Sequence, residues 1–207
     1  MTENRYGSLL DFLNKAEKLK ETYRFSAHEP LAGKESSADH SWRVALLASL
    51  IHRDLELDLD LRKAIEMILI HDLPHSITKD IDEVDVGEDG RITKEQQYEL
   101  ESKAIGILGD IIDEGGDNFI SPLWKEYADA DSREAKFVHA LSRIETILHL
   151  IEEGHEKYDD PEIIAHYADE AVENFPELKP LLKDVKKSLR QEFEKGDIEW
   201  KGKYDRV

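Results

Sequence analysis

The chain has 207 residues and carries 28 Lys and Arg against 47 Asp and Glu, a formal net charge of −19. Such an acidic chain is a poor partner for long nucleic acid, whose binding depends on Lys and Arg neutralising phosphates. The absence of Cys excludes a disulfide framework, a zinc finger, an iron–sulfur cluster and thiol catalysis. An apolar fraction of 40% is enough for a packed core, so the sequence predicts a folded protein.

The sequence offers no candidate for a membrane segment or a leader. No stretch approaches the roughly 20 consecutive apolar residues that cross a bilayer, and the charged start does not resemble a signal peptide. We therefore expect a cytoplasmic protein with no membrane partner. Asn and Gln are scarce while Lys, Glu and Ile are abundant, a composition typical of a thermophile.

Apolar residues recur at helical spacing along the chain, and no alternating strand pattern interrupts them. Helices are expected, in chain order, over 6–23, 36–53, 61–72, 93–114, 121–127, 132–153, 161–174 and 178–194. The second and third of these are apolar almost all round, which predicts two buried helices. The segment 132–153 has its apolar residues spaced by 4, 3, 4 and 3 positions, which predicts one continuous apolar stripe.

Local signals mark several helix ends. Thr93 followed by Gln96 matches a capping box at the start of one helix. Ser121 and Pro122 suit the cap and the first turn of the next helix. Between the buried helices and Thr93, the polar connection 73–93 is long for a compact protein, and loops of that length are usually functional.

We expect a single all-α domain over residues 1–207. Its core spans about 12–150, and the C-terminal helices at about 160–195 pack on that core. The charged tail from Gly196 is expected to be loosely held, with Trp200 as the residue that could dock it.

The strongest chemical feature is the pair His71-Asp72 at the end of a buried apolar helix. His40 lies at the start of the other buried helix. Facing helices in all-α folds build metal sites from such imidazole and carboxylate side chains. Nitrogen donors favour Mn, Fe, Co, Ni or Zn over Mg or Ca. The alternative is that the helix ends at solvent with both members of the pair exposed.

Three stretches carry a family resemblance: residues 35–41, residues 70–81 with the pair at their start, and residues 134–138. Together they resemble the HD-domain metal-dependent phosphohydrolase superfamily, in the branch of the bacterial 5′-deoxynucleotidases and the eukaryotic HD-domain-containing proteins. The resemblance covers about 12–150. It implies an HD-type helical bundle that holds a divalent metal with two His and two Asp and hydrolyses a phosphate ester.

Five positions of this chain match functional residues of the family. His40, His71 and Asp72 match three metal ligands. Asp80 matches an acidic residue that acts on water or the leaving group. Arg24 falls where the related nucleotidases have an Arg that binds the phosphate.

Two positions depart from the family pattern. The fourth ligand, an Asp in the family, is Ser142 here, and a neutral hydroxyl is a weaker donor than a carboxylate. The family Glu three residues after the His-Asp pair is His75, which could bind metal or take an acid/base role. His75, His139 and Glu145 are the candidates for a replacement ligand, beside a site completed by water or no metal at all.

The sequence thus favours a phosphohydrolase acting on a nucleotide or similar small phosphate ester through one divalent transition metal. The departures at Ser142 and His75 support an alternative, a catalytically weakened HD protein that binds a nucleotide or partner without turnover. The family resemblance also makes a homodimer plausible.

Overall fold

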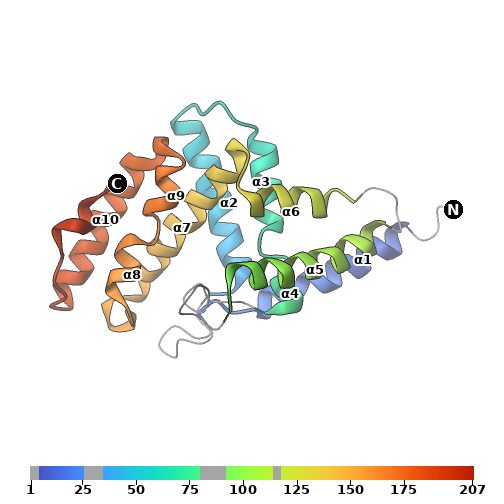
Figure 1. Cartoon of the computed structure of the whole chain (residues 1–207), viewed down its shortest axis with the longest axis horizontal. Helices are drawn as coiled ribbons and strands as arrows, with labels where there is room; N and C mark the ends of the chain where they lie inside the picture. The colour runs from blue at the N-terminus through green and yellow to red at the C-terminus, as the bar shows by residue number, and fades with distance from the viewer. Residues whose placement is uncertain (1–4, 26–34, 80–91, 114–117) are drawn as a thin grey trace. The chain divides into compact units, whose positions relative to one another are not determined.

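The computed structural model describes residues 5–25, 35–79, 92–113 and 118–207. Within these ranges every regular element is a helix (Figure 1), and an isolated antiparallel bridge joins Tyr23 to Ser36. The prediction of an all-α fold is confirmed. Among the described helices, none combines the length and apolar character that a bilayer crossing requires.

The chain divides into two compact units, and the division falls within two helices. The first unit comprises Met1–Trp42 and Glu66–Ala130, and the second comprises Arg43–Ile65 and Asp131–Val207. The helices α2 (Ser37–Asp54) and α3 (Leu61–Ile70) therefore each contribute to both units.

The first unit is built around α5, with α1 and α6 packed along it and α4 against it (Figure 1). Its elements are α1 (Arg5–Ala16), the 3-10 helix η1 (Glu17–Glu21), α4 (His75–Thr78), α5 (Lys94–Asp113) and α6 (Ile120–Asp129), with parts of α2 and α3. The core joins apolar side chains from nearly all of these elements: Phe12, Leu19, Ile70, Leu73, Ile105, Leu108, Ile120 and Trp124. Burying each such side chain contributes about 1.5–3 kcal/mol, which fixes the end of α3 against α5 and α6.

The second unit is built around α7, against which α9 and α10 pack. Its elements are α7 (Arg133–Glu153), η3 (His155–Lys157), α8 (Pro161–His166), α9 (Asp169–Glu173), η4 (Pro176–Leu178), α10 (Lys179–Lys195) and η5 (Gly202–Asp205). The predicted stripe of α7 is buried at Phe137, Leu141 and Ile144. Ser132 caps α7, because its side chain accepts a hydrogen bond from the backbone N–H of Ala135.

The start of α5 is confirmed and that of α6 is corrected. Thr93 and Gln96 exchange hydrogen bonds of 2.8 and 3.2 Å, which is the predicted capping box. Ser121 does not cap α6, which begins one residue earlier, at Ile120. Asn118 takes the capping role instead, because its Oδ1 accepts from the backbone N–H of Ser121 at 3.2 Å.

Two expectations about the C-terminal part were wrong. The expected helix over 161–174 is interrupted between α8 and α9. The tail is docked rather than loose, since Tyr204 is buried and the ring of Trp200 lies 5.3 Å from that of Phe193. The ammonium of Lys186 donates to two carbonyls of that tail, at 2.8 and 2.6 Å.

Candidate metal centre

His71 and Asp72 follow directly on the last residue of α3, in the turn that leads to α4. The expected helix over 61–72 thus ends two residues earlier. The backbone N–H of His71 still donates to the carbonyl of Met67 at 2.8 Å, which continues the helical pattern by one bond. Met67 and Ile68 are fully buried, so the end of α3 is drawn into the core and carries His71 with it.

His40 is placed by the start of α2. Ser36 precedes the helix, and its hydroxyl accepts from the backbone N–H of Asp39 at 3.1 Å. The carboxylate of Asp39 accepts in return from the backbone N–H of Ser36, also at 3.1 Å. This reciprocal cap satisfies two groups that a helix start leaves unpaired. His40 follows in the first turn with its side chain 1% exposed.

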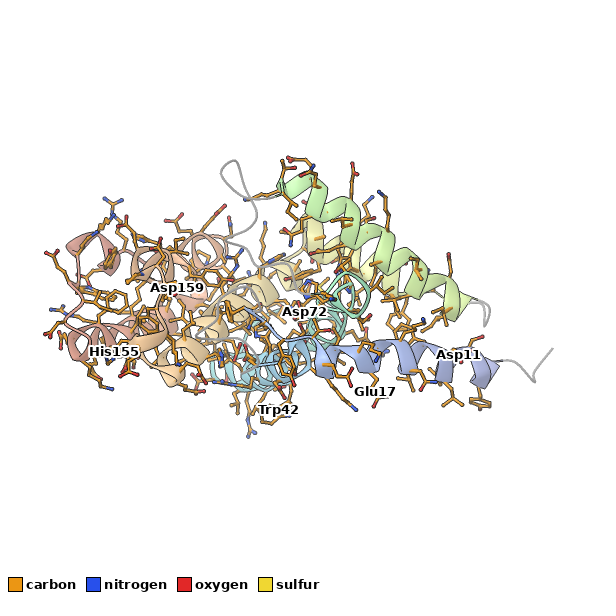
Figure 2. The ribbon with its side chains drawn as sticks, turned by 90° about the horizontal axis from the view of Figure 1, so that it is seen from below. Asp11, Glu17, Trp42, Asp72, His155 and Asp159 are labelled. Carbon is orange, nitrogen blue, oxygen red and sulfur yellow. The ribbon has the colours of Figure 1, made fainter. Side chains whose placement is uncertain are left out.

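The structure brings three of the predicted ligands together within the first unit. His40, His71 and Asp72 each offer a ligand atom, and these atoms lie within 4.8 Å of one another. The centroids of the two imidazole rings are 5.6 Å apart. Figure 2 labels Asp72, which follows α3 in the chain.

The hydrogen bond of His71 decides which of its nitrogens can bind a cation. Nδ1 lies 2.7 Å from the carbonyl oxygen of Ile68, which can only accept, so Nδ1 carries the proton. Nε2 then presents a lone pair; it is buried without a hydrogen-bond partner among the described residues. Its neighbour at 3.2 Å is Oδ1 of Asp72, another acceptor. Two acceptors that face each other in a buried site fit a cation between them.

Asp72 is ionised in this setting. Burial alone would raise the pKa of its carboxyl, but the electrostatic influence of the neighbouring His71, His75, His40 and Arg24 outweighs burial and lowers the pKa to about 2. The side chain is 13% exposed. A nearly buried carboxylate beside three imidazoles and a guanidinium is an anionic ligand at any neutral pH.

Arg24 lies beside the cluster and hydrogen-bonds the buried side chains of Glu35 and His40. Its Nη1 donates to Oε2 of Glu35 at 2.7 Å and to Nδ1 of His40 at 2.8 Å. The side chains of Arg24 and Glu35 are 12% and 3% exposed. Backbone hydrogen bonds of 2.9 Å, from Arg24 to Glu35 and from Ser37 to Thr22, hold the two segments side by side.

His75 lies at the edge of the cluster rather than in it. Its Nδ1 is 3.7 Å from Oδ1 of Asp72, and its Nε2 is 3.6 Å from Oε1 of Glu101 on α5. His75 begins α4, after the turn that contains Pro74, so it does not share a helix face with His71. The remaining predicted acid/base residue, Asp80, lies outside the described residues.

The other proposed ligands belong to α7 in the second unit. Glu145 is buried there, with Oε1 at 3.1 Å from Nε of Arg43. His139 and Ser142 are half-buried. The identity of a fourth ligand therefore stays a prediction from the sequence.

Three residues beside the cluster were not singled out by the sequence: Trp124, Tyr127 and Glu101. The indole of Trp124 donates to the carbonyl of His71, and the ring of Tyr127 lies edge-on to that of His71, with centroids 5.4 Å apart. On α6 both aromatics read as ordinary apolar positions, and only the tertiary fold brings them to His71. Glu35 is the first residue of the stretch 35–41 that carries part of the family resemblance, but its position in the sequence does not indicate a hydrogen-bond partner.

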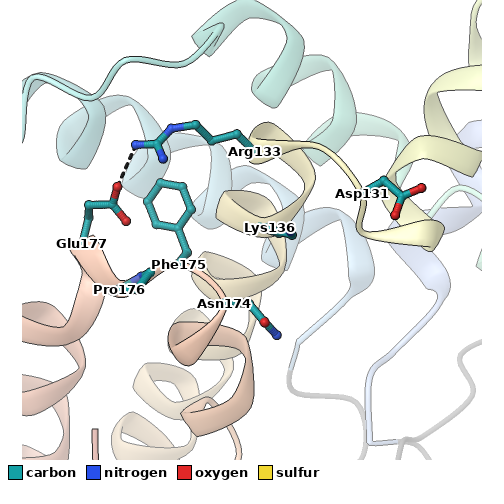
Figure 3. Close-up of a pocket in the computed structure, with 7 residues that line it drawn as sticks. All are labelled: Asp131, Arg133, Lys136, Asn174, Phe175, Pro176 and Glu177. Carbon is teal, nitrogen blue, oxygen red and sulfur yellow. Dashed lines mark hydrogen bonds and ion pairs between the residues drawn. The ribbon is translucent and has the colours of Figure 1, made fainter.

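A pocket of about 740 Å³ lies elsewhere, in the second unit (Figure 3). Arg133 and Glu177 pair across it at 2.7 Å, and the guanidinium of Arg133 stacks on the ring of Phe175 at 5.0 Å. None of the three clustered ligands lines it. The pocket therefore does not belong to the candidate metal centre.

Comparison with known proteins identifies the family. The model of a family described as HD domain matches residues 16–195. The chain belongs to the HD domain family. Among curated members, this HD-domain chain is 32% identical to human 5'-deoxynucleotidase HDDC2 over 142 residues, 68% of this chain and 66% of the relative. It is 34% identical to the Dictyostelium discoideum protein of the same name over 124 residues, 57% of this chain and 62% of that relative.

The matches span slightly less than two thirds of the first relatives' own length, 66% for the human protein and 65% for the bovine one. Solved structures support the fold of the HD-domain chain. A "Predicted metal-dependent phosphohydrolase" from Magnetospirillum magnetotacticum superposes with a TM-score of 0.74 at 22% identity, covering 95% of this chain and 99% of that chain. A protein from Pyrococcus horikoshii has a TM-score of 0.67 at 20% identity, covering 86% and 99%.

Proposed function

We propose that this HD-domain chain is a metal-dependent phosphohydrolase that releases phosphate from a deoxynucleoside 5′-monophosphate or a similar small phosphate ester. The observation that carries the proposal is the buried cluster of His40, His71 and Asp72, in which Nε2 of His71 faces Oδ1 of Asp72. The relatives named 5'-deoxynucleotidase support the choice of substrate class.

His40, His71 and Asp72 would hold the metal. Their donor set of two imidazoles and one carboxylate suits Mn, Co, Ni, Fe or Zn. A divalent ion held by these residues would supply Lewis-acid chemistry, polarising a phosphate oxygen and lowering the pKa of water. Asp72 contributes a fixed negative charge to this site, since its carboxyl stays ionised.

Other side chains have roles toward the substrate. Arg24 supplies a guanidinium that offsets the charge of the phosphate. His75 is within 3.7 Å of Asp72 and can exchange a proton at Nδ1 or Nε2 with water or the departing oxygen. Asp80 would share this acid/base role on the strength of the sequence alone.

A phosphate-release screen tests the proposal. Deoxy- and ribonucleoside mono- and triphosphates are incubated with the protein and Mn, Co, Ni, Zn or Mg, and free phosphate is measured. We expect deoxynucleoside monophosphates to be hydrolysed by the wild type and by Asp11→Asn, a control on the exposed face of α1. Asp72→Asn should be inactive, because it removes the one charged ligand in the described cluster.

The same screen separates the proposal from the catalytically weakened alternative. A wild type that binds metal and nucleotide but releases no phosphate under any metal would support the weakened HD protein. The homodimer, the cytoplasmic location and the thermophilic origin stay predictions, and light scattering of the purified protein tests the first of them.

A further inference from the structure

The pocket of about 740 Å³ in the second unit has the size of a small-molecule site, for which roughly 300–1,000 Å³ is typical (Figure 3). The first turn of α7 contributes Arg133 and Lys136 to its lining, and the turn between α9 and α10 contributes Asn174, Phe175 and Glu177. None of the three clustered metal ligands lines it. A ligand held here therefore occupies a second site.

Three contacts hold the guanidinium of Arg133 in one orientation. Nε donates to the carbonyl of Asp58 at 3.0 Å, and Nη2 donates to Oε1 of Glu177 at 2.7 Å. The guanidinium carbon lies over the ring of Phe175, 5.0 Å from its centroid. Phe175 is 2% exposed and the side chain of Arg133 is 45% exposed, so the guanidinium covers the ring and turns its other face outward. A guanidinium fixed in this way is a preorganised surface for a second flat ring.

Lys136 adds a positive charge to the same lining. It follows Arg133 by three positions on α7, which places the two side chains on one face of the helix. Lys136 is half-buried, and its ammonium has no ion pair or hydrogen bond to any residue that the structure describes. Glu177 is committed to Arg133, and its own backbone N–H together with Arg133 lowers the pKa of its carboxyl. Among the described lining residues, Lys136 is therefore the cation left for an anionic group.

We propose that this pocket binds a flat aromatic ring that carries a single phosphate or carboxylate group. The ring lies on the outward face of the Arg133 guanidinium, as nucleobases and other flat rings do on arginine. The anionic group accepts a charge-assisted hydrogen bond from Nζ of Lys136.

The charges of the lining limit the ligand to one acidic group. Among the described lining residues, Arg133 and Lys136 are matched by Asp131 and Glu177. Each further phosphate would bring negative charge toward these two carboxylates with no further lining cation to meet it. A nucleoside monophosphate or an aromatic carboxylate fits this balance better than a triphosphate does.

Amide ¹H–¹⁵N spectra of the full chain, treated with chelator, test the proposal because they report which residues a ligand contacts. AMP, adenosine and inorganic phosphate separate the contributions of the ring and the anion. We expect AMP to shift the amides of Arg133, Lys136 and Phe175 and to bind about tenfold or more tightly than either of its parts. Pocket amides that respond to neither AMP nor benzoate, or AMP binding no tighter than adenosine or phosphate, would overturn the proposal.

Two further probes define the anionic group. Benzoate carries a carboxylate on a flat ring, so a response to AMP alone assigns the site to phosphates and a response to benzoate alone assigns it to carboxylates. ATP should bind no more tightly than AMP, because its additional phosphates face Asp131 and Glu177. Tighter binding of ATP would contradict the limit of one acidic group.

Two substitutions test the assigned roles separately. Lys136→Gln removes the charge and should weaken AMP binding about tenfold. Arg133→Lys keeps the charge but removes the planar surface, so it should weaken AMP about tenfold and leave inorganic phosphate unchanged. Lys183→Gln, an exposed change on α10 in the same unit, is the control and should alter neither affinity. The spectra also show whether each variant is folded, and full AMP affinity in both pocket variants would overturn the proposal.

These readouts are independent of the metal centre and of turnover. Pocket amides that respond to AMP in a protein that releases no phosphate with any metal would refute the proposed function alone. Hydrolysis by a protein whose pocket amides ignore every probe would refute the second site alone.

Discussion

The indole Nε1 of Trp124 donates a hydrogen bond to the main-chain carbonyl of His71 across 3.3 Å. Trp124 lies on α6 and is 2% exposed, so water does not compete for this carbonyl. The bond ties the turn after α3 to a neighbouring helix at the residue that also presents Nε2 to the cluster. A buried tryptophan thus fixes the position of a metal-ligand candidate through its backbone.

Trp124→Phe tests this tie. The change keeps an aromatic ring in the core but leaves the carbonyl of His71 without its donor. We expect a loss of about 1 kcal/mol in the free energy of unfolding and weaker metal binding. Trp200→Phe removes an indole donor whose hydrogen bond, from Nε1 to Asp205, is exposed, and serves as the matched control. Equal metal affinity in both variants would contradict a positioning role for Trp124.

Removing the imidazole of His71 should strip the metal. Wild-type protein purified after incubation with Mn, Co, Ni or Zn is expected to hold about one ion per chain, as bundle sites built from facing helices do. His71→Ala should lose it, because a ligand and the partner of Asp72 disappear together. His52→Ala, a half-buried histidine outside the cluster, is the control. Elemental analysis that finds equal metal in wild type and His71→Ala would exclude this site.

His75 should affect turnover rather than metal content. Its ring lies between two carboxylates, 3.7 Å from Asp72 and 3.6 Å from Glu101, outside the group of clustered ligands. We expect His75→Ala to keep the metal and to lower kcat by about 10²-fold or more, as loss of an acid/base group does. His75→Glu, which introduces the family residue, should recover part of the rate. Loss of metal in His75→Ala would instead make His75 a ligand.

Two glycines on α5 should respond in opposite directions to the same change. A Cβ at Gly106 would meet nothing within 4 Å, so Gly106→Ala should stabilise the helix by about 0.5–1 kcal/mol. A Cβ at Gly109 would lie 2.5 Å from the side chains of Asn118 and Ser121, which hydrogen-bond each other at the start of α6. Gly109→Ala should therefore destabilise by about 1–3 kcal/mol. Denaturant unfolding of the two variants checks both signs.

Glu192 should make the free energy of unfolding of the second unit depend on pH. Lys195 and His155 hydrogen-bond its carboxylate and lower its pKa from 4.5 to about 2. The folded pKa lies below the unfolded value, so the stabilisation is complete above pH 4.5 and is lost as the pH falls towards 2. We expect Glu192→Gln to cost about 1–2 kcal/mol at neutral pH and almost nothing at the acid end.

The control for this experiment is Glu194→Gln. Glu194 lies on the same helix and pairs with Arg190 at the surface, with a 61% exposed side chain. Its substitution should change the free energy of unfolding little at any pH, since exposed pairs contribute at most about 1 kcal/mol. A pH-independent difference between Glu192→Gln and wild type would contradict the assignment to this carboxylate.

Periodicity predicted the elements whose apolar residues form one long stripe. The stripe of α7 was readable because Phe137, Leu141 and Ile144 repeat at helical spacing over a single face. The interruption between α8 and α9 could not be predicted, because the helical spacing of apolar residues continues across it. Docking of the tail on Phe193 depends on aromatic rings that the sequence leaves far apart.

For the site, the sequence pointed to His40, His71 and Asp72 because each was expected at the end of a helix buried all round. That expectation was wrong for α2, because Trp42, Leu46 and Leu50 are exposed. The sequence could not supply the partners that set their chemistry. Trp124 reaches His71 across 53 positions, and no local pattern records such a contact. The pairing of Arg24 with Glu35 is likewise tertiary, and it changes how Arg24 has to be understood: as a side chain already engaged before any phosphate arrives.

The small antiparallel bridge between Tyr23 and Ser36 has a consequence for how this protein can vary. The flanking backbone hydrogen bonds, from Arg24 to Glu35 and from Ser37 to Thr22, hold the two segments together. The side chains of Arg24 and Glu35 pair beside these bonds. Residues can be added or removed between Arg24 and Glu35 at a cost in loop-closure free energy that grows only with the logarithm of their number. The number of residues between Tyr23 and Ser36 can therefore change while the backbone pairing at Arg24 and Glu35, and the bond from Arg24 to His40, stay in place.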